Sequence, residues 1–382
     1  EYAKGWSMGE ATPEELTAMC RLTAEAMEDG AFGVATALIY PPNSYSTDTE
    51  LVEIARVVAR YGGVYITHMR SEGDRLLESL ADTIALGRQT GVAVEVYHLK
   101  ATGQRNWSKM PEAIAMIDAA RAEGVDVGAN MYPYVASGTG LGAILPDWAA
   151  AEGKLEERLH DPEMRRRIRE EVLAPGNRVQ LAGGPEGVLV VGLQHPEHQP
   201  YVGKTLAEIA TLRGQDWVDT VFDLVCAEGP WVHTMYFLMS EENLRLQMRQ
   251  PWIKFGTDAP GLDPAHPHLL LTHHPRAYGT YPRILGKYVR EEGVLTWEEA
   301  IRKMTSAVAN RLHIRDRGLL REGYYADVVL FDPDTVEDRA TFSHPHQLSS
   351  GIREVWVNGQ RVLAHGQHTG ALPGRPVYGP GR

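Results

Sequence analysis

A repeated strand-and-helix unit constrains the fold of this chain more than any other feature of its sequence. Nearly continuous apolar runs occupy residues 33–40, 64–68, 92–98 and 125–134, and each run ends in a polar loop. Segments with apolar residues at helical spacing separate these runs. The unit recurs about every thirty residues, which is typical of a parallel sheet whose faces are covered by helices.

The helices between the runs carry their own start and stop signals. Thr12 precedes Pro13, Glu14 and Glu15. This order predicts a helix start, because threonine caps a helix, proline suits its first turn and acids favour its positive end. Further helices are expected over residues 49–61, 74–89 and 111–122, each with glycine close behind it.

The rhythm of the unit changes twice along the chain. Residues 140–250 hold a helix with many charges over 156–173, a glycine-rich stretch with short strands over 181–193, and a helix over 216–226. Residues 252–261 resume the strand-to-loop pattern, residues 296–309 fit a helix, and short strands with turns follow from about residue 314. We therefore expect a barrel domain over 1–312 with an insertion at about 141–250, and a small β domain over 313–382.

Charge and cysteine content exclude several classes of protein. The 382 residues have a formal net charge of −12, so nucleic acid and anionic lipid surfaces are poor electrostatic partners. No apolar run reaches the length of a membrane span, and no basic-then-apolar signal peptide opens the chain. The two cysteines, Cys20 and Cys226, lie in helical patterns, which favours a reducing compartment and predicts a cytoplasmic location.

Polar and aromatic side chains gather where the predicted strands end. In parallel sheets and barrels these ends form one rim, at which active sites lie. The residues in question are Tyr40, His68, His98, the step Tyr132-Pro133-Tyr134, and Asp258. Two neutral imidazoles and a carboxylate are a plausible ligand set for zinc, and an aspartate near such a site can serve as a general base.

Each of these residues also has an ordinary structural interpretation. A histidine at a strand end is often simply hydrogen-bonded, Asp258 can cap a turn, and the tyrosines can be packing residues. Most of the remaining histidines in proline-rich loops are interpreted as surface turn residues, although two of them lie close to Arg276. They are His195, His198, His266, His268 and, near Arg276, His273 and His274. Spacing alone therefore supports a barrel enzyme and leaves open whether it binds a metal.

Several long motifs together resemble one known family. They are GAFGVATALIYPPNSYS, YGGVYITHMRSEG, VYHLKATGQRNWSK, DVGANMYPYVASGTGLGAILPDWA, FGTDAPG, HHPRAYGTYPRILGKYVRE and RDRGLLREGYYADVVLFDPDTVEDRATF. In this order they resemble the N-acyl-D-amino-acid deacylase (D-aminoacylase) branch of the amidohydrolase superfamily. The similarity covers nearly the whole chain and is weakest in the predicted insertion, and several motifs in one order are more specific than any single short pattern.

This resemblance implies a fold and an activity. The fold is a (β/α)8 TIM-type barrel with a small β-sandwich, and the activity is zinc-dependent hydrolysis of the amide in N-acyl-D-amino acids, which are the expected small-molecule partners. By position in the motifs, His68 and His98 match zinc ligands and Asp258 matches the aspartate that activates water. Arg276 matches the arginine that holds the substrate carboxylate. The positions matching residues that line the carboxylate or the scissile amide are Tyr40, Lys100 and Tyr132.

The chain departs from the family pattern in two places. The family's first strand carries a His-x-His pair, whereas no histidine precedes Tyr40 here and Cys20 lies in a helical pattern. Residues 33–40 then correspond to the fourth strand, so the first three βα units, roughly ninety residues, are expected to be missing. A chain truncated in this way would bind zinc weakly and turn over poorly. The second departure is the histidine-rich loop between Asp258 and Arg276. Its length could shift Arg276, the expected clamp for the substrate carboxylate, and so alter substrate choice.

Two alternatives to a deacylase remain at this point. A cyclic amidohydrolase, like hydantoinases or dihydroorotases, shares the scaffold but bridges two metals with a modified lysine on strand four, and residues 33–40 contain no lysine. A catalytically impaired fragment that only binds a ligand or a partner chain is the other alternative. The preferred acyl group, the preferred D side chain and the oligomeric state cannot be read from the sequence.

Overall fold

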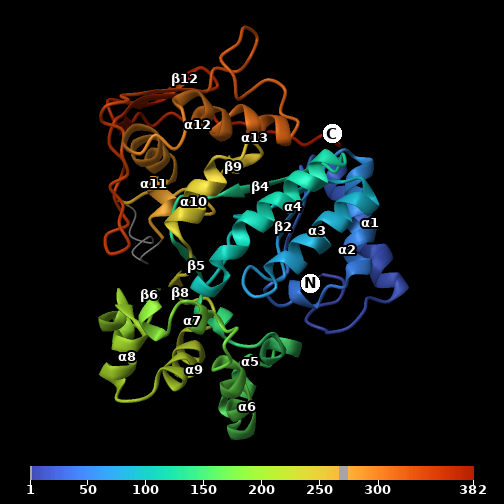
Figure 1. Ribbon diagram of the computed structural model, residues 1–382, viewed down its shortest axis with the longest axis vertical. Helices are drawn as coiled ribbons and strands as arrows, with labels where there is room; N and C mark the ends of the chain where they lie inside the picture. The colour runs from blue at the N-terminus through green and yellow to red at the C-terminus, as the bar shows by residue number, and fades with distance from the viewer. Residues whose placement is uncertain (1, 266–273) are drawn as a thin grey trace.

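Five parallel strands form the central sheet of the protein (Figure 1). The computed structural model describes residues 2–265 and 274–382. The sheet has the order β1-β2-β3-β4-β9, and its strands are β1 (Gly33–Ala37), β2 (Val64–His68), β3 (Ala93–Val96), β4 (Val127–Met131) and β9 (Ile253–Phe255). The parallel sheet predicted from the apolar runs is confirmed; β2 matches its run, and the other strands are shorter than theirs.

Helices connect and cover these strands, as the alternating pattern predicts. They are α1 (Pro13–Glu28), α2 (Asp48–Arg60), α3 (Leu76–Thr90), α4 (Met110–Ala122) and, before β9, α10 (Glu241–Met248). Helix α1 begins where the sequence indicates, because the Thr12 side chain accepts a hydrogen bond from the Glu15 N–H and the Glu15 carboxylate accepts one from the Thr12 N–H. Short 3-10 helices, η1 (Asn43–Tyr45) and η2 (Gln104–Lys109), lie in the loops after β1 and β3.

One continuous apolar core joins this sheet to its helices. Leu80 of α3, Val94 of β3 and Ile117 of α4 are among its fully buried members. Each such side chain contributes roughly 1.5–3 kcal/mol to stability when buried.

The backbones of β1 and β2 approach closely at Gly33. A side chain there would not fit, since its Cβ would lie 1.8 Å from the Val64 carbonyl oxygen. Among the described residues β1 pairs only with β2 and β9 only with β4, so closure into a barrel stays a prediction.

A second, antiparallel sheet lies between β4 and β9 in the chain, at the bottom of Figure 1. Its order is β5-β8-β6-β7, with β5 (Ala136–Gly140), β6 (Val188–Gly192), β7 (Lys204–Thr205) and β8 (His233–Phe237). The helices of this segment are α5 (Leu155–His160), α6 (Pro162–Val172), α7 (Arg178–Leu181), α8 (Leu206–Arg213) and α9 (Trp217–Glu228), with 3-10 turns η3 (Leu141–Ile144), η4 (Asp147–Gly153), η5 (Pro185–Gly187) and η6 (Pro196–Tyr201). A second apolar cluster fills the space between them.

The single helix predicted over residues 156–173 is wrong, because the structure breaks it at Asp161. Asp161 has an extended backbone (ψ 122°), and its side chain caps α6 by accepting from the Met164 N–H. Pro162 explains the break, since a proline disfavours helical geometry in the residue before it and suits the first position of a new helix. The sequence therefore contained the signal for two helices.

After β9 the chain forms a helical segment and then a third sheet. The helices are α11 (Arg276–Arg283), the π-helix η8 (Ile284–Glu291), α12 (Trp297–Met304) and α13 (Ser306–Arg311). The helix predicted over 296–309 is likewise two helices, because Thr305 (φ −127°, ψ −91°) interrupts it. The antiparallel sheet has the order β10-β11-β12-β13, with strands β10 (Val328–Phe331), β11 (Ile352–Val357), β12 (Gln360–Ala364) and β13 (Gln367–His368).

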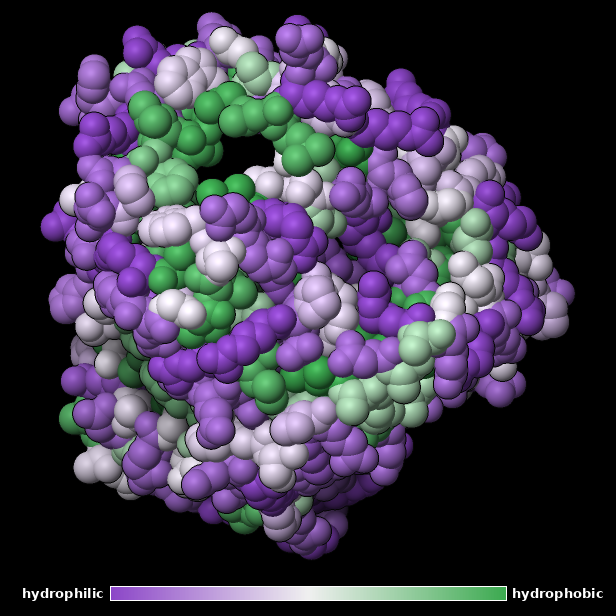
Figure 2. All heavy atoms as spheres, turned by 45° about the horizontal axis from the view of Figure 1, so that its top comes forward, coloured by the Kyte–Doolittle hydropathy of each residue, from purple (hydrophilic) through white to green (hydrophobic). Residues whose placement is uncertain are grey.

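The surface is mostly hydrophilic, with apolar side chains gathered around a hollow on the face shown in Figure 2. No helix in the described ranges is long and apolar enough to cross a membrane. The cytoplasmic location and the lack of a nucleic-acid partner stay predictions, as does the division into domains at residues 312 and 313.

Candidate active site

Each strand of the parallel sheet delivers a candidate residue at or just beyond its C-terminal end. His68 is the last residue of β2, and His98 lies two residues beyond β3. Tyr132 follows β4 directly, Tyr40 lies three residues beyond β1, and Asp258 lies three residues beyond β9. Because the five strands are parallel neighbours, these side chains meet at one rim of the sheet.

Two of these residues form a buried cluster with a carboxylate. One ligand atom each from His68, Glu72 and His98 lie within 4.8 Å of one another. Glu72 Oε2 is 3.3 Å from His68 Nε2, and Glu72 Oε1 is 3.1 Å from His98 Nδ1. The imidazole centroids are 4.5 Å apart, and all three side chains are buried. His68 Nε2 is buried without a well-directed hydrogen bond, as expected of an atom aimed at a cation.

The sequence did not single out Glu72. It lies in the polar loop after β2, four residues after His68, and only the fold of that loop turns it back beside both histidines. An acidic residue shortly after a strand-end histidine was the available signal. The same loop contains a second acidic residue, Asp74, which binds Arg105 and not the histidines. Acidity alone would therefore not have told which of the two carboxylates joins the cluster.

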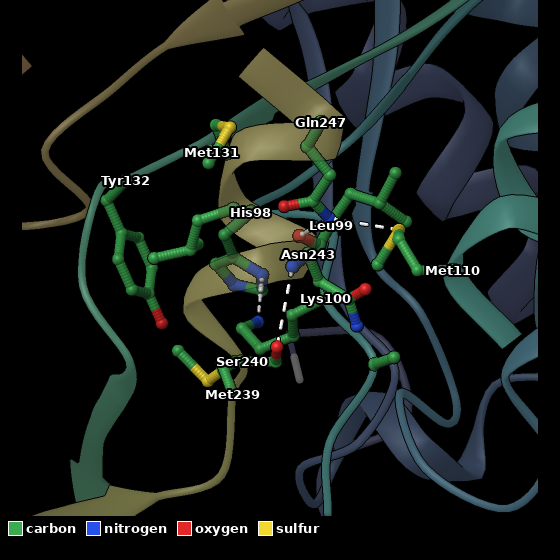
Figure 3. A pocket seen from close by; sticks show the side chains of 12 residues that line it. His98, Leu99, Lys100, Met110, Met131, Tyr132, Met239, Ser240, Asn243 and Gln247 are labelled. Atoms are coloured by element: carbon green, nitrogen blue, oxygen red, sulfur yellow. Dashed lines mark hydrogen bonds between the residues drawn. The ribbon is translucent and has the colours of Figure 1, made fainter. Parts of the chain in front are cut away.

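Lys100 supplies the positive charge that keeps Glu72 ionised. Its Nζ lies 2.5 Å from Glu72 Oε1 and 2.6 Å from His98 Nδ1, and a dashed line between Lys100 and His98 marks the second contact in Figure 3. Burial alone raises the pKa of Glu72, but the histidines and Lys100 outweigh it and hold the pKa well below its usual range. Burial lowers the pKa of His68 to about 4, so His68 is neutral near pH 7 and its nitrogen can bind a metal.

Two of the candidate residues hold strained backbone conformations. His98 has φ 34° and Asp258 has φ 48°, in the left-handed region that residues other than glycine seldom adopt. Asn130 of β4 supports the first, because its side-chain oxygen accepts a hydrogen bond of 2.7 Å from the His98 N–H. Such strain persists where neighbours enforce it, and it is frequent at functional sites.

A cavity of about 430 Å³ lies against this cluster. The parallel sheet contributes the residues of its rim, strand β5 of the antiparallel sheet lines another side, and helix α7 contributes Arg178. The lining side chains that can bind a ligand or exchange a proton with it are Tyr40, His68, Glu72, Tyr97, His98, Lys100, Tyr132, Ser137, Arg178, Asp258 and Arg276. Apart from Tyr134, every candidate site residue named from the sequence lines this one cavity, together with Glu72 and Arg178, which the sequence did not identify.

Asp258 and Arg276 lie beside each other in this cavity. Asp258 Oδ2 is 2.6 Å from Arg276 Nη1, although the two groups are not aligned for a hydrogen bond. The guanidinium also lies over the Tyr132 ring, 4.6 Å from its centroid. Arg276 Nε and Nη1 are buried and have no well-aligned hydrogen-bond acceptor among the described residues, so Nε can donate to an anion, and Nη1 can do so if the anion displaces Asp258.

Tyr40 and Tyr132 flank the histidines from two sides. The Tyr40 ring meets His68 edge-on, with centroids 5.3 Å apart, and the Tyr132 ring lies 6.3 Å from His98. Burial raises the pKa of Tyr132, so its hydroxyl remains protonated and can donate. That hydroxyl is buried and has no partner within the described part of the chain. Tyr132 and Tyr134 both belong to the second apolar cluster, but Tyr134 does not line the cavity, which fits its packing interpretation.

Two histidines expected at the surface are buried, so that expectation is wrong for them. His274 Nδ1 accepts a hydrogen bond from the Arg276 N–H, and the other ring nitrogen lies 2.9 Å from the Ala136 oxygen. His198 Nδ1 lies 2.7 Å from the buried Glu228 carboxylate. Both rings gain hydrogen-bond partners that loop composition cannot reveal. His266, His268, His273 and most of the histidine-rich loop lie outside the described residues.

Similarity to known proteins agrees with this geometry. The model of the amidohydrolase family matches residues 3–363. The chain is 36% identical over 365 residues to D-aminoacylase of Alcaligenes xylosoxydans xylosoxydans, covering 96% of this chain and 65% of that protein. It is 36% identical over 350 residues to N-acyl-D-glutamate deacylase of the same organism, covering 92% of this chain and 62% of that protein.

A solved structure gives the same result at the level of the fold. N-acyl-D-glutamate deacylase of Bordetella bronchiseptica, in a complex with zinc and a phosphonate inhibitor, superposes with a TM-score of 0.76 at 31% identity. The match covers 97% of this chain and 66% of that one. The resemblance drawn from the motifs is confirmed, and this chain spans somewhat less than two thirds of the length of these relatives.

Proposed function

Because this chain belongs to the amidohydrolase family, we propose that it hydrolyses the amide bond of N-acyl-D-amino acids with the help of zinc. The products are a carboxylate and a free D-amino acid. One observation carries this proposal: a buried His68–Glu72–His98 cluster shares a cavity with an aspartate and with an arginine that has unused donors. The relatives that are D-aminoacylases and N-acyl-D-glutamate deacylases support the choice of substrate class.

The residues present fit a zinc ion. His68 and His98, with Glu72, would hold it, and the buried His68 Nε2 without a well-directed partner is the atom that most needs a cation. When bound, zinc polarises an amide carbonyl and makes water a better nucleophile near neutral pH. Lys100 would keep Glu72 ionised and oriented, since its ammonium is buried against that carboxylate.

The protein's own groups would manage the proton and the substrate. Asp258 would take a proton from the attacking water and return it to the departing amine nitrogen. Arg276 would hold the substrate carboxylate through its buried Nε and Nη1, which also orients the chiral carbon. The unpartnered Tyr132 hydroxyl would donate to the oxyanion that develops on the acyl carbonyl, and Tyr40 would close the site beside His68.

We further propose that the five parallel strands are an arc of the family's (β/α)8 barrel. Among the described residues β1 and β9 each have one unpaired edge, which supports further pairing, since exposed edges are usually paired or covered. The barrel domain would span residues 1–312, with the second sheet as its insertion, and the small β domain would span 313–382. The three separate sheets support this division; the second sheet has an apolar cluster of its own, whereas Val336 of the small β domain packs in the cluster of the parallel sheet.

A substrate panel tests the proposed function. The purified protein, supplied with zinc, should release acetate from N-acetyl-D-amino acids and spare their L-isomers and ring substrates such as hydantoin. His98→Ala should abolish release, whereas the matched change at an exposed histidine, His160→Ala, should not. Hydrolysis of only L-isomers or only rings would overturn the proposal, and tight binding of N-acetyl-D-amino acids without turnover would favour a ligand-binding role.

A further inference from the structure

A second cavity adjoins the cavity at the strand ends and differs from it in character. Its volume is about 360 Å³, which is within the range of small-molecule sites. Tyr40 and Thr139 line both cavities, so the two meet at these side chains. The buried side chains of Leu145, Leu159 and Val225 form part of the wall of this second cavity, and we call it the apolar cavity.

Negative side chains are the only charged groups that line the apolar cavity within the described part of the chain. They are Asp147 and Glu156, and no lysine, arginine or histidine accompanies them. The cavity at the strand ends instead contains Lys100, Arg178 and Arg276. An anionic group therefore finds no partner in the apolar cavity, whereas the burial of hydrocarbon there is favourable. The two adjoining cavities suit the anionic part and the apolar part of one ligand.

Backbone hydrogen bonds hold one wall of the apolar cavity in place. The Leu141 N–H donates to the Val232 carbonyl oxygen and the Gly142 N–H donates to the Pro230 carbonyl oxygen, both at 2.8 Å. Glycine permits this approach, because a Cβ at Gly142 would lie 2.6 Å from Pro230 Cβ. The next residue, Trp231, also lines the cavity and is 69% exposed, so it offers a ligand further apolar surface. A wall built in this way needs little ordering when a ligand binds.

The order of the parallel strands indicates which part of the proposed substrate faces the apolar cavity. Asp258 follows β9 and lies beside Arg276 at one end of the sheet, whereas Tyr40 follows β1 at the other end. His68 and His98 follow β2 and β3, between these two ends. A substrate whose carboxylate binds Arg276 and whose amide lies over the two histidines therefore extends its acyl group towards Tyr40. The apolar cavity begins at that side chain.

We propose that the apolar cavity binds the acyl chain of the substrate, so that the protein prefers N-acyl-D-amino acids with a medium-length aliphatic acyl group to their N-acetyl counterparts. The choice of ligand rests on the deacylase function proposed above. A water molecule takes up about 30 Å³ of liquid and a methylene group is of similar size, so the cavity has room for a chain of about eight carbons. Each methylene group that leaves water for this cavity strengthens binding.

A series of acyl chain lengths tests this assignment. N-acetyl-, N-butanoyl-, N-hexanoyl- and N-octanoyl-D-alanine share one amino acid and differ only in the acyl chain. The kcat/KM should rise along the series, and its value for the octanoyl substrate should exceed that for the acetyl substrate by at least about 50-fold, mainly through KM. N-succinyl-D-alanine carries an anionic acyl group and should be poorer than the butanoyl substrate. Equal kcat/KM for these two would contradict an apolar site for the acyl chain.

Substitutions that fill the cavity locate the effect. Ala143→Phe places a ring in the apolar cavity and should lower the octanoyl-to-acetyl ratio of kcat/KM by at least about 20-fold. Ala150→Phe fills the same cavity from η4 and should lower the ratio as well, so the test does not depend on the folding of one variant. The matched control is Ala115→Phe, at an exposed alanine of α4 that lines neither cavity, and it should keep the ratio.

The outcomes separate this proposal from the general function. Equal efficiency along the series, or a preference for the octanoyl substrate that both filled variants keep, would overturn the acyl-chain site while leaving the deacylase intact. Absence of hydrolysis for every N-acyl-D-amino acid would instead overturn the deacylase. In that case calorimetry with N-octanoyl- and N-acetyl-D-alanine decides for the apolar cavity: tighter binding of the octanoyl compound, lost in Ala143→Phe, supports the acyl-chain site, and equal binding contradicts it.

Discussion

Asp258 Oδ2 lies 2.6 Å from Arg276 Nη1, so the proposed base and the proposed carboxylate clamp contact each other before substrate binds. The contact is poorly aligned, and within the described part of the chain neither Nη1 nor Nε of Arg276 has a well-directed hydrogen-bond acceptor. A substrate carboxylate can therefore displace Asp258 by offering better geometry to the same guanidinium. Asp258 would then be released as a base only when a carboxylate-bearing substrate is present.

The first prediction concerns this aspartate. Asp258→Asn should lower kcat by at least about 100-fold, because the amide cannot accept a proton. Asparagine tolerates the φ of 48° at this position, so the backbone and the zinc content should be kept. Steady-state kinetics, metal analysis and circular dichroism check these points together. A variant that retains half of the activity would exclude Asp258 as the base.

The second prediction separates catalysis from stability at Tyr132. Tyr132→Phe should lower kcat by about 10- to 100-fold with little change in KM, because the hydroxyl is needed only for the developing oxyanion. It should not lower the free energy of unfolding, since the buried hydroxyl has no hydrogen-bond partner to lose among residues 2–265 and 274–382.

Tyr288→Phe is the matched control for this change. Its hydroxyl donates to Glu241 at 3.0 Å, so removal should cost about 1 kcal/mol of stability and leave kcat unchanged. Urea unfolding and kinetics on both variants give the comparison. A Tyr132→Phe variant that is destabilised but fully active would assign Tyr132 to packing.

The third prediction concerns the buried pair of Glu72 and Lys100. Glu72→Gln should lower the free energy of unfolding by about 3 kcal/mol, because it leaves the Lys100 ammonium buried without a counter-ion. Adding Lys100→Met should recover more than half of this loss. Glu78→Gln is the matched control, because it breaks the surface ion pair between Arg75 and Glu78, whose side chains are 71% and 63% exposed. It should change the free energy of unfolding little. Equal effects from the two glutamates would argue against a special role for Glu72.

The fourth prediction follows from the pKa of His68. In the unfolded chain this imidazole takes up a proton near pH 6.5, whereas in the metal-free folded protein its pKa is about 4. Between these values the unfolded state binds more protons, so stability falls as pH is lowered, by about 3 kcal/mol by pH 4. His68→Gln should remove this part of the pH dependence, measured by urea unfolding with a chelator present. An unchanged slope would show that His68 titrates normally.

The sequence predicted the place at the rim of those candidate residues whose position depends only on strand order. His68, His98, Tyr132 and Asp258 follow apolar runs of a parallel sheet, so the period of the pattern was enough to bring them to one rim. The sequence also predicted the start of a helix that has a strong N-cap, as at Thr12 before α1. These features are local, or they follow from the regularity of the sheet.

The features that the sequence did not reveal depend on tertiary contacts. Glu72 reaches the histidines because its loop folds back over the strand end, and Arg178 reaches the cavity from an irregular segment between the two sheets. The burial of His274 depends on β5, which supplies its acceptor Ala136. The break at Asp161, by contrast, was encoded by the proline that follows it.

The most direct test of this account is anomalous diffraction at the zinc edge from crystals grown with zinc. We predict a single strong peak bonded to imidazole nitrogens of both His68 and His98, at about 2.0–2.1 Å, and its loss in His98→Ala. A zinc peak elsewhere in the cavity, or one bonded to neither histidine, would contradict the assignment of this rim as the metal centre.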